Sequence, residues 1–281
     1  MNFLESFLQK NARPFLISPE GIYYHVEKQG EGRKPLAGEY VKVNYTGKFL
    51  NGQMFDTSEG RAPFVFKLGQ GSVIKGWDLG LSLFKEGSKG ILYLSPEFAY
   101  GEQGAGGVIP PNATLMFEIE LLEILDEAGY QAHEAAKMEE QKRMMQAYVE
   151  KQMAEEMPKI MAYAEQEGLE LQRTTSGLHY VMETEGTGAQ AEAGKTVSVH
   201  YTGRLLDGGK FDSSYDRNQP IAFPLGGGRV IAGWDEGIAL FKVGGKGKLV
   251  IPSYLGYGPQ NMGSIPPNSI LVFDIELVKV E

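Results

Sequence analysis

The chain has 281 residues, of which 42% are hydrophobic and 22% charged, and its formal net charge is −9. This balance is typical of globular domains, and the length leaves room for two of ordinary size. The acidic charge gives no support to binding of nucleic acid or of a membrane surface. Because the chain has no cysteine, disulfides, thiol nucleophiles and thiolate metal sites are excluded.

Residues 1–17 are predicted to contain a short amphipathic helix, from Asn2 to Gln9. Four apolar residues recur there at helical spacing: Phe3, Leu4, Phe7 and Leu8. Few basic residues flank them, so we expect this face to pack on the protein rather than on a membrane. Charged residues interrupt the segment in a way that does not suit a signal peptide. We therefore expect a cytoplasmic protein, or a periplasmic one if a signal peptide was removed from a precursor.

From residue 18 onward, one string of rare residues occurs twice. The stretch Val73–Asp78, reading VIKGWD, is answered by Val230–Asp235, reading VIAGWD, and these stretches hold the only two tryptophans. Equivalent residues are 156 positions apart at Tyr45 and Tyr201 but 157 apart at the tryptophans. The differences in length fall in loops, where they are easily tolerated. We predict a first domain over 18–126 and a second over 171–281.

Each repeat is predicted to be mostly strands. In the first, residues 22–27, 40–49, 90–95 and 113–125 are rich in β-branched and aromatic residues. Asn51-Gly52, answered by Asp207-Gly208, predicts a hairpin with a type I′ turn. Residues 78–84 have a helical period. About five strands and one short helix make an α+β domain.

Residues 127–170 are predicted to form a helical connector, because Ala, Glu, Gln, Lys and Met dominate the segment. Pro158 is expected to break or kink this helix. Six methionines occur in it: Met138, Met144, Met145, Met153, Met157 and Met161. The simplest interpretation is a spacer whose methionine face packs on a domain. Alternatively, the methionines form a dimer seam or a surface that binds client proteins, since methionine adapts to irregular partners.

The motifs of common enzyme chemistry are missing from the sequence. The four histidines have no metal-ligand spacing, and neither a nucleophile elbow nor a phosphate-binding loop occurs. We therefore expect no metal and no cofactor. What remains is a set of aromatic and branched residues around each tryptophan, with Asp56 beside Phe55. Each of these could be core on its own, but a pocket floored by tryptophan with few polar groups is typical of a small-ligand site.

With these motifs, both repeats resemble the FKBP family of peptidyl-prolyl cis–trans isomerases, which also bind macrolides of the rapamycin type. The resemblance implies a curved antiparallel sheet wrapped on a short helix. It implies these catalytic residues: Tyr45, Phe55, Asp56, Trp77, Tyr100, Phe117, Tyr201, Phe211, Asp212, Trp234, Tyr257 and Phe273. It implies these substrate-binding residues: Phe64, Val73, Ile74, Ile109, Ile221, Val230, Ile231 and Ile265. The Ile109 N–H and the Tyr100 hydroxyl would hold substrate carbonyls.

The second repeat departs from the family pattern at Ile221, which replaces the aromatic Phe64, and in a loop that is one residue shorter before Pro266. The function implied is acceleration of Xaa-Pro isomerisation in unfolded or flexible polypeptides, without acid, base or cofactor. The alternative is a folding chaperone or scaffold with weak or no turnover in one or both domains. The implied partners are proline-containing client polypeptides, with rapamycin-type macrolides as inhibitors. A homodimer through the connector is a further expectation.

Overall fold

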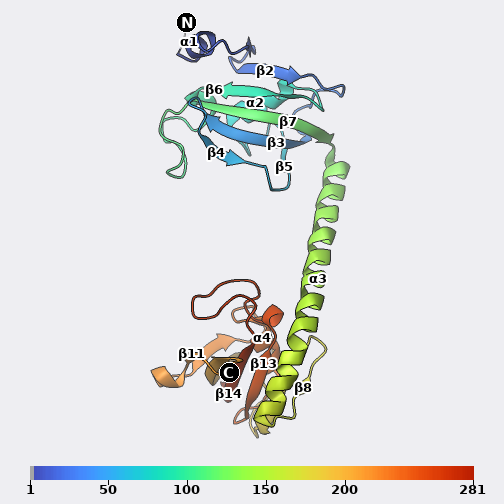
Figure 1. Cartoon of the computed structure of the whole chain (residues 1–281), viewed down its shortest axis with the longest axis vertical. Coiled ribbons are helices and arrows are strands. Elements are labelled where there is room, and N and C mark those ends of the chain that lie inside the picture. Colours follow the sequence, from blue (N-terminus) through green and yellow to red (C-terminus); the bar gives the residue numbers. More distant parts are fainter. Residues whose placement is uncertain (1–2) are drawn as a thin grey trace. The chain divides into compact units, whose positions relative to one another are not determined.

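The computed structural model describes residues 3–281, which form two compact units that meet inside one long helix, between Glu139 and Glu140. Figure 1 labels many of the helices and strands, and in the text η marks a 3-10 helix. The first unit contains α1 (Phe3–Lys10), β1 (Leu16–Ile17), β2 (Tyr23–Lys28), β3 (Tyr40–Phe49), β4 (Met54–Thr57), β5 (Phe64–Lys67), α2 (Lys75–Gly80), η1 (Leu81–Leu83), β6 (Lys89–Leu94), η2 (Pro96–Phe98) and β7 (Leu115–Leu125). Helix α3 (Glu127–Glu167) crosses the boundary. The second unit contains β8 (Gln172–Arg173), β9 (His179–Thr184), β10 (Thr196–Leu205), β11 (Lys210–Ser213), η3 (Tyr215–Arg217), β12 (Ile221–Pro224), α4 (Ala232–Ile238), β13 (Lys246–Ile251), η4 (Ser253–Leu255) and β14 (Leu271–Val280).

Both units are built on one antiparallel sheet of the same topology. The strand order is β1-β2-β6-β7-β3-β4 in the first, with β5 also paired to β3. In the second it is β8-β9-β13-β14-β10-β11, with β12 paired to β10. The predicted α+β class is confirmed. Each sheet has seven strands rather than about five, because the two-residue and four-residue strands are too short to show an alternating pattern.

A short helix packs against each sheet and carries the tryptophan. Helix α2 begins at Lys75, three residues before the predicted start, and η1 continues it. The early turn approaches the sheet closely at Gly76, where an added Cβ would lie 2.5 Å from a methyl carbon of Leu94. A pattern of large apolar side chains does not reveal a contact made by glycine, so the prediction missed this first turn.

The predicted type I′ turn is wrong. Only Gly52 has a positive φ, of 89°, while Asn51 does not. The Gly52 N–H donates to the Phe49 carbonyl at 2.9 Å, and the Asn51 carboxamide oxygen accepts from the Gln53 N–H at 2.9 Å. This is the longer hairpin loop, in which an ordinary turn is followed by a left-handed glycine. The side-chain bond of Asn51 favours it over the two-residue turn, and the second unit repeats the arrangement at Gly208.

The outer face of each sheet is covered by a helix that precedes the domain in sequence. In the first unit, Leu4 and Leu8 of α1 pack in a buried cluster with Tyr23, Tyr93 and Met116. The prediction that this helix packs on the protein is confirmed, although Asn2, its expected start, lies outside the described residues. In the second unit, Ile160 of α3 packs in a buried cluster with Val250 and Val272 of the equivalent strands and with Ile270, which precedes β14. Leu4 and Ile160 are 156 residues apart, so the repeat includes the covering helix.

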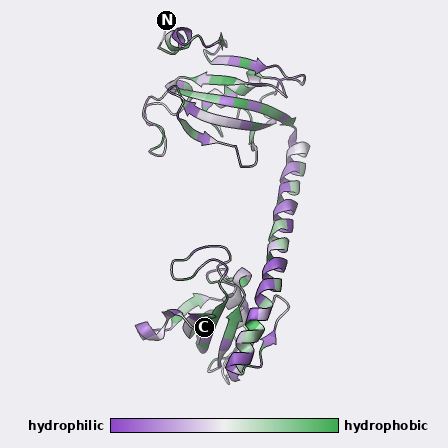
Figure 2. Cartoon of the chain, viewed as in Figure 1, coloured by the Kyte–Doolittle hydropathy of each residue, from purple (hydrophilic) through white to green (hydrophobic). Residues whose placement is uncertain are grey.

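Helix α3 forms in the predicted segment but runs unbroken through Pro158, so the predicted break is wrong. Its buried residues are Gln152, Glu156, Ile160 and Ala164, and this packing holds the last turns in place despite the missing N–H. Figure 2 shows that α3 is largely hydrophilic. The expectation that its methionine face packs on a domain fails for Met138, Met144, Met145 and Met161, which are 54–69% exposed. Within residues 3–281, no helix combines the length and the apolar character needed to cross a membrane.

Candidate active site

A cavity of about 240 Å³ lies in the first domain, between the sheet and helix α2. Nine of the ten residues predicted for this site line it, from β3, β4, β5, α2, β7 and the loops between them: Tyr45, Phe55, Asp56, Phe64, Val73, Ile74, Trp77, Tyr100 and Phe117. Ser72 is an additional lining residue that the sequence did not indicate. The tenth residue, Ile109, is buried in the core cluster of the same domain.

Trp77 is the floor of this cavity and is only 4% exposed. Its ring lies edge-to-face with those of Tyr45 and Phe117, at centroid distances of 5.0 and 5.3 Å. Phe64 meets it at 6.0 Å from the side of β5. Edge-to-face packing fixes the rings relative to one another. The result is a rigid, apolar bowl of a size suited to a small ring.

The second domain assembles the equivalent residues in the same way. Trp234 is 4.9 Å from Tyr201 and 5.1 Å from Phe273, both edge-to-face. Phe211 packs edge-to-face on Phe273 at 5.6 Å. The remaining predicted residues belong to the same hydrophobic cluster: Ile221, Val230, Ile231, Tyr257 and Ile265. Asp212 lies at the polar side of the site, like Asp56 in the first domain.

Asp56 is held by two donors beside the first cavity. The Tyr45 hydroxyl donates to one carboxylate oxygen at 2.5 Å, and Arg61 donates to the other at 2.6 Å. Burial raises the pKa of Asp56, but these hydrogen bonds lower it by more, so the net shift is downward. Burial and the neighbouring carboxylate raise the pKa of Tyr45 to about 12. At neutral pH the pair is therefore a carboxylate and a neutral phenol.

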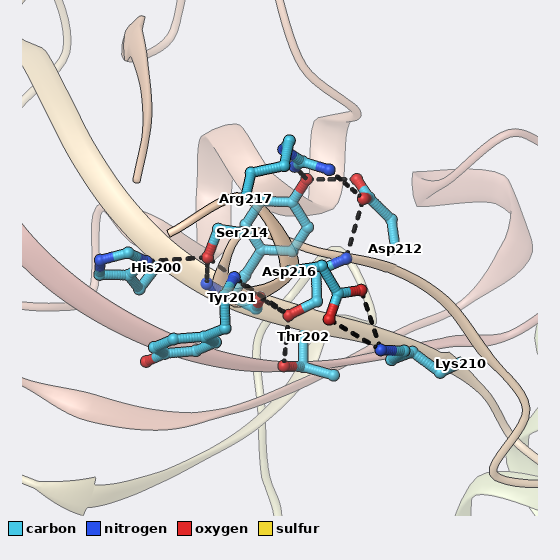
Figure 3. A network of polar contacts seen from close by, with 10 residues as sticks. His200, Tyr201, Thr202, Lys210, Asp212, Ser214, Asp216 and Arg217 are labelled. Carbon is cyan, nitrogen blue, oxygen red and sulfur yellow. Dashed lines mark hydrogen bonds and ion pairs between the residues drawn. The ribbon is translucent and has the colours of Figure 1, made fainter. Parts of the chain in front are cut away.

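Figure 3 shows the corresponding network in the second domain, where the second hydrogen bond of the arginine goes to the tyrosine hydroxyl, whereas that of Arg61 goes to the Thr57 carbonyl. Arg217 donates to Asp212 at 2.6 Å and to the Tyr201 hydroxyl at 2.8 Å, while that hydroxyl also donates to Asp212. The bond from Arg217 is the main cause of the lowered pKa of Asp212. Sequence reasoning missed both arginines. The available signal was that an arginine follows the aspartate by five positions in each repeat.

Of the two donors implied by the resemblance, the structure leaves the Tyr100 hydroxyl available but not the Ile109 N–H. The Ile109 N–H already donates to the Ala105 carbonyl at 3.0 Å, inside its own loop. By contrast, among the described residues the N–H groups of Ile74 and Ile231, which precede α2 and α4, have no backbone partner. The hydroxyl of Tyr100, a residue that lines the first cavity, has no partner within residues 3–281 either. These groups can therefore hold carbonyl oxygens of a bound chain.

Comparison with known proteins agrees with this geometry. The profile of a family described as "FKBP-type peptidyl-prolyl cis-trans isomerase" matches residues 31–122 and again residues 187–278. The FKBP-type isomerase FkpA of Aeromonas hydrophila is 52% identical over 122 residues, which are 43% of this chain and 44% of that protein. FKBP9 of Rattus norvegicus is 32% identical over 241 residues, 85% of this chain and 34% of that protein. The chain thus spans less than half the length of both relatives.

A shorter relative is covered almost completely. FK506-binding protein 1 of Dictyostelium discoideum is 52% identical over 103 residues, which are 36% of this chain and 96% of that protein. Among solved structures, that of FkpA from Escherichia coli is 40% identical, covering 56% of this chain and 74% of that chain at a TM-score of 0.41.

Proposed function

The chain belongs to the FKBP-type peptidyl-prolyl cis–trans isomerase family, and we propose that both of its domains accelerate Xaa-Pro isomerisation in unfolded or flexible polypeptides. The two domains are proposed to be residues 18–126 and 171–281, joined by the connector 127–170. The proposal rests on one observation above others. In each domain an edge-to-face aromatic bowl with a tryptophan floor stands beside an ionised aspartate that is held by a tyrosine and an arginine.

The reaction needs a lower barrier to rotation about one amide bond. That barrier, about 18–20 kcal/mol, comes from the charge-separated resonance form of the planar amide. An apolar bowl solvates this form poorly, so transfer from water into the bowl disfavours the planar state relative to the twisted one. Each tenfold acceleration requires about 1.4 kcal/mol of such preference.

The donors of the site complete the mechanism. With the proline ring on Trp77, the Ile74 N–H and the Tyr100 hydroxyl bind carbonyl oxygens on either side of the rotating bond. The Tyr100 hydroxyl remains a donor at neutral pH, because burial raises its pKa above the ordinary value of a phenol. Asp56 keeps the Tyr45 ring in place rather than transferring a proton. Binding that is stronger for the twisted state than for the planar one then gives catalysis.

The test uses the full chain with one site disabled at a time. The first site is disabled by Phe55→Ala with Asp56→Ala, and the second by Phe211→Ala with Asp212→Ala. Each single-site chain should accelerate cis–trans exchange of a Xaa-Pro tetrapeptide above the chain that has both sites disabled. A rapamycin-type macrolide should block each rate. If a folded single-site chain gives the same rate as the doubly disabled chain, that domain is not an isomerase.

Unfolded or proline-containing polypeptides are the proposed clients, and macrolides of the rapamycin type the proposed inhibitors. A second role, as a chaperone that holds clients without turnover, is favoured by one observation: four methionines on α3 are 54–69% exposed. Such flexible apolar side chains suit irregular partners. The alternative is that the same side chains form a homodimer seam. Sedimentation velocity distinguishes the two roles: a seam predicts a dimer of the full chain that is lost when these methionines are changed to Gln.

A further inference from the structure

The C-terminal half of α3 reaches over the second domain and bonds to the start of the loop that carries Tyr257. The Ser253 N–H donates to a carboxylate oxygen of Glu156 at 2.8 Å, and the Ser253 hydroxyl donates to the Gln152 side-chain oxygen at 3.5 Å. All three residues are at most 5% exposed. Ser253 opens the short helix η4, so Glu156 caps that helix from a different part of the chain.

About two turns before Glu156, α3 contacts the other loop of the site. The Tyr148 hydroxyl donates to the Asn268 side-chain oxygen at 2.9 Å. It also lies over Gly258, where an added Cβ would be 3.4 Å from the hydroxyl oxygen. The Asn268 N–H donates to the Gly258 carbonyl at 2.7 Å, which joins the two loops. These loops carry Tyr257 and Ile265, both assigned to the second site.

The first domain has the same pair of loops, but within residues 3–281 no side chain caps η2 in this way. Its Asn112 N–H donates to the Gly101 carbonyl at 2.8 Å, as in the second domain. At the position of Ser253, however, it has Pro96, which opens η2 and has no N–H to donate. A carboxylate like Glu156 would have no partner there. The serine in the second repeat and the glutamate on α3 are therefore matched to each other.

A glutamate such as Glu156 is unfavourable on a packed helix face. One of its carboxylate oxygens is buried without a partner among the described residues, and burial raises the pKa of the group; the charge of Glu155 raises this pKa further and that of Lys159 lowers it. A buried carboxyl group costs stability unless its bonds are needed. An apolar residue would pack as well but would leave the Ser253 N–H without an acceptor.

We propose that α3 is a positioning element of the second site, in which Glu156 and Tyr148 hold the loops of Tyr257 and Ile265 in the geometry that binds substrate. This rests on the proposed isomerase function of that domain. Among the described residues, α3 makes no such hydrogen bonds to the corresponding loops of the first domain, which carry Tyr100 and Ile109.

The test uses the full chain with the first site disabled. Glu156→Ala and Tyr148→Phe should each lower kcat/KM of the second site, by about tenfold for Glu156→Ala, because small misplacements of binding groups are costly. Glu156→Gln keeps an acceptor for the Ser253 N–H and should restore the rate. Glu155→Ala, on the exposed side of the same turn, is the matched control. With the second site disabled instead, Glu156→Ala should not change the rate of the first.

Amide hydrogen exchange at 253–258 and 265–268 separates this inference from the proposed function. Faster exchange there in Glu156→Ala and Tyr148→Phe, but not in Glu155→Ala, supports positioning even if the second domain has no isomerase activity. Unchanged exchange overturns the inference, as does an unchanged kcat/KM in an active, folded Glu156→Ala chain. Loss of activity that Glu156→Gln fails to restore also overturns it, because the carboxylate oxygen would then not be the relevant acceptor.

Discussion

Phe64 and Ile221 occupy the same register position in the two sheets, Phe64 opposite Val43 and Ile221 opposite Val199. Phe64 lies 6.0 Å from Trp77 and 6.3 Å from Tyr45, both in edge-to-face contact, and it is 41% exposed at the rim of the cavity. Ile221 packs on the second core without any such ring contact. The two bowls therefore share their floor and differ in one wall at the rim.

Replacing Ile221 with Phe should move the substrate preference of the second site towards that of the first. An aromatic contact contributes about 0.5–1.5 kcal/mol, so we expect kcat/KM ratios among peptides with different residues before proline to shift about two- to tenfold. The measurement is a panel of Xaa-Pro tetrapeptides on the chain with its first site disabled. Phe64→Ile in the chain with its second site disabled is the reciprocal control. If neither profile changes, this wall does not determine preference.

The rate of the first site should be nearly independent of pH from mildly acidic to neutral conditions. The pKa of Asp56 is lowered and that of Tyr45 is raised to about 12, so neither changes charge in this range. The pKa of Asp56 is lower in the folded than in the unfolded chain, so its ionisation stabilises the fold at any pH above the unfolded-state pKa. This stabilisation is lost only as the pH falls through the folded-state pKa. A pH–rate profile of the chain with its second site disabled checks this. A bell-shaped profile centred on neutrality would reveal an acid–base step.

Much of the site could be predicted because the repeat marks it twice. The residues around Trp77 and Phe117 occur again around Trp234 and Phe273, and in each domain the fold brings helix and strand together as the resemblance implied. What was missed has a common cause. The Ile74 N–H, the capping of Ser253 and the approach of Gly76 to Leu94 are backbone features, and residue types alone do not encode them. Arg61 was missed because an arginine in a polar loop resembles any solvated charge until its partner is placed.

The predictions for the hairpin turn and for the connector helix failed for different reasons. Asn51-Gly52 fits two hairpin loops, and the bond from its own side chain to Gln53 selects between them. Pro158 fits a helix break, but tertiary packing of Ile160 and Ala164 outweighs the lost hydrogen bond. In both cases local propensity was interpreted correctly and another interaction decided the outcome.

The covering helices should contribute to stability independently in the two domains. Leu8, on the packed face of α1, is completely buried, so Leu8→Ala should lower the free energy of unfolding of the first domain by about 2–4 kcal/mol. Ile160→Ala should do the same for the second. Trp77 and Trp234 report each domain separately in urea unfolding, with the other tryptophan changed to Phe. Phe3→Ala, at a position 71% exposed, is the control. An effect of Leu8→Ala as small as the control would mean that α1 is not docked in solution.

The last prediction concerns whether the connector does more than join two isomerases. A proline pocket contacts only a few residues of a client and binds it weakly. A second pocket on the same chain raises the effective concentration of the next encounter, and this gain needs no contribution from the linker surface. Exposed methionines on α3 would add a second gain by giving the client an adaptable apolar surface.

The two gains can be separated. The intact chain should speed proline-limited refolding, or suppress aggregation, better than an equimolar mixture of the two single domains. Changing Met138, Met144, Met145 and Met161 to Gln removes the exposed apolar surface but keeps good helix formers, so helicity measured by circular dichroism should survive. If the methionines bind clients, this variant falls towards the mixture. If it performs like the intact chain, tethering alone explains the advantage. If the mixture itself matches the intact chain, neither gain exists and α3 is only a spacer.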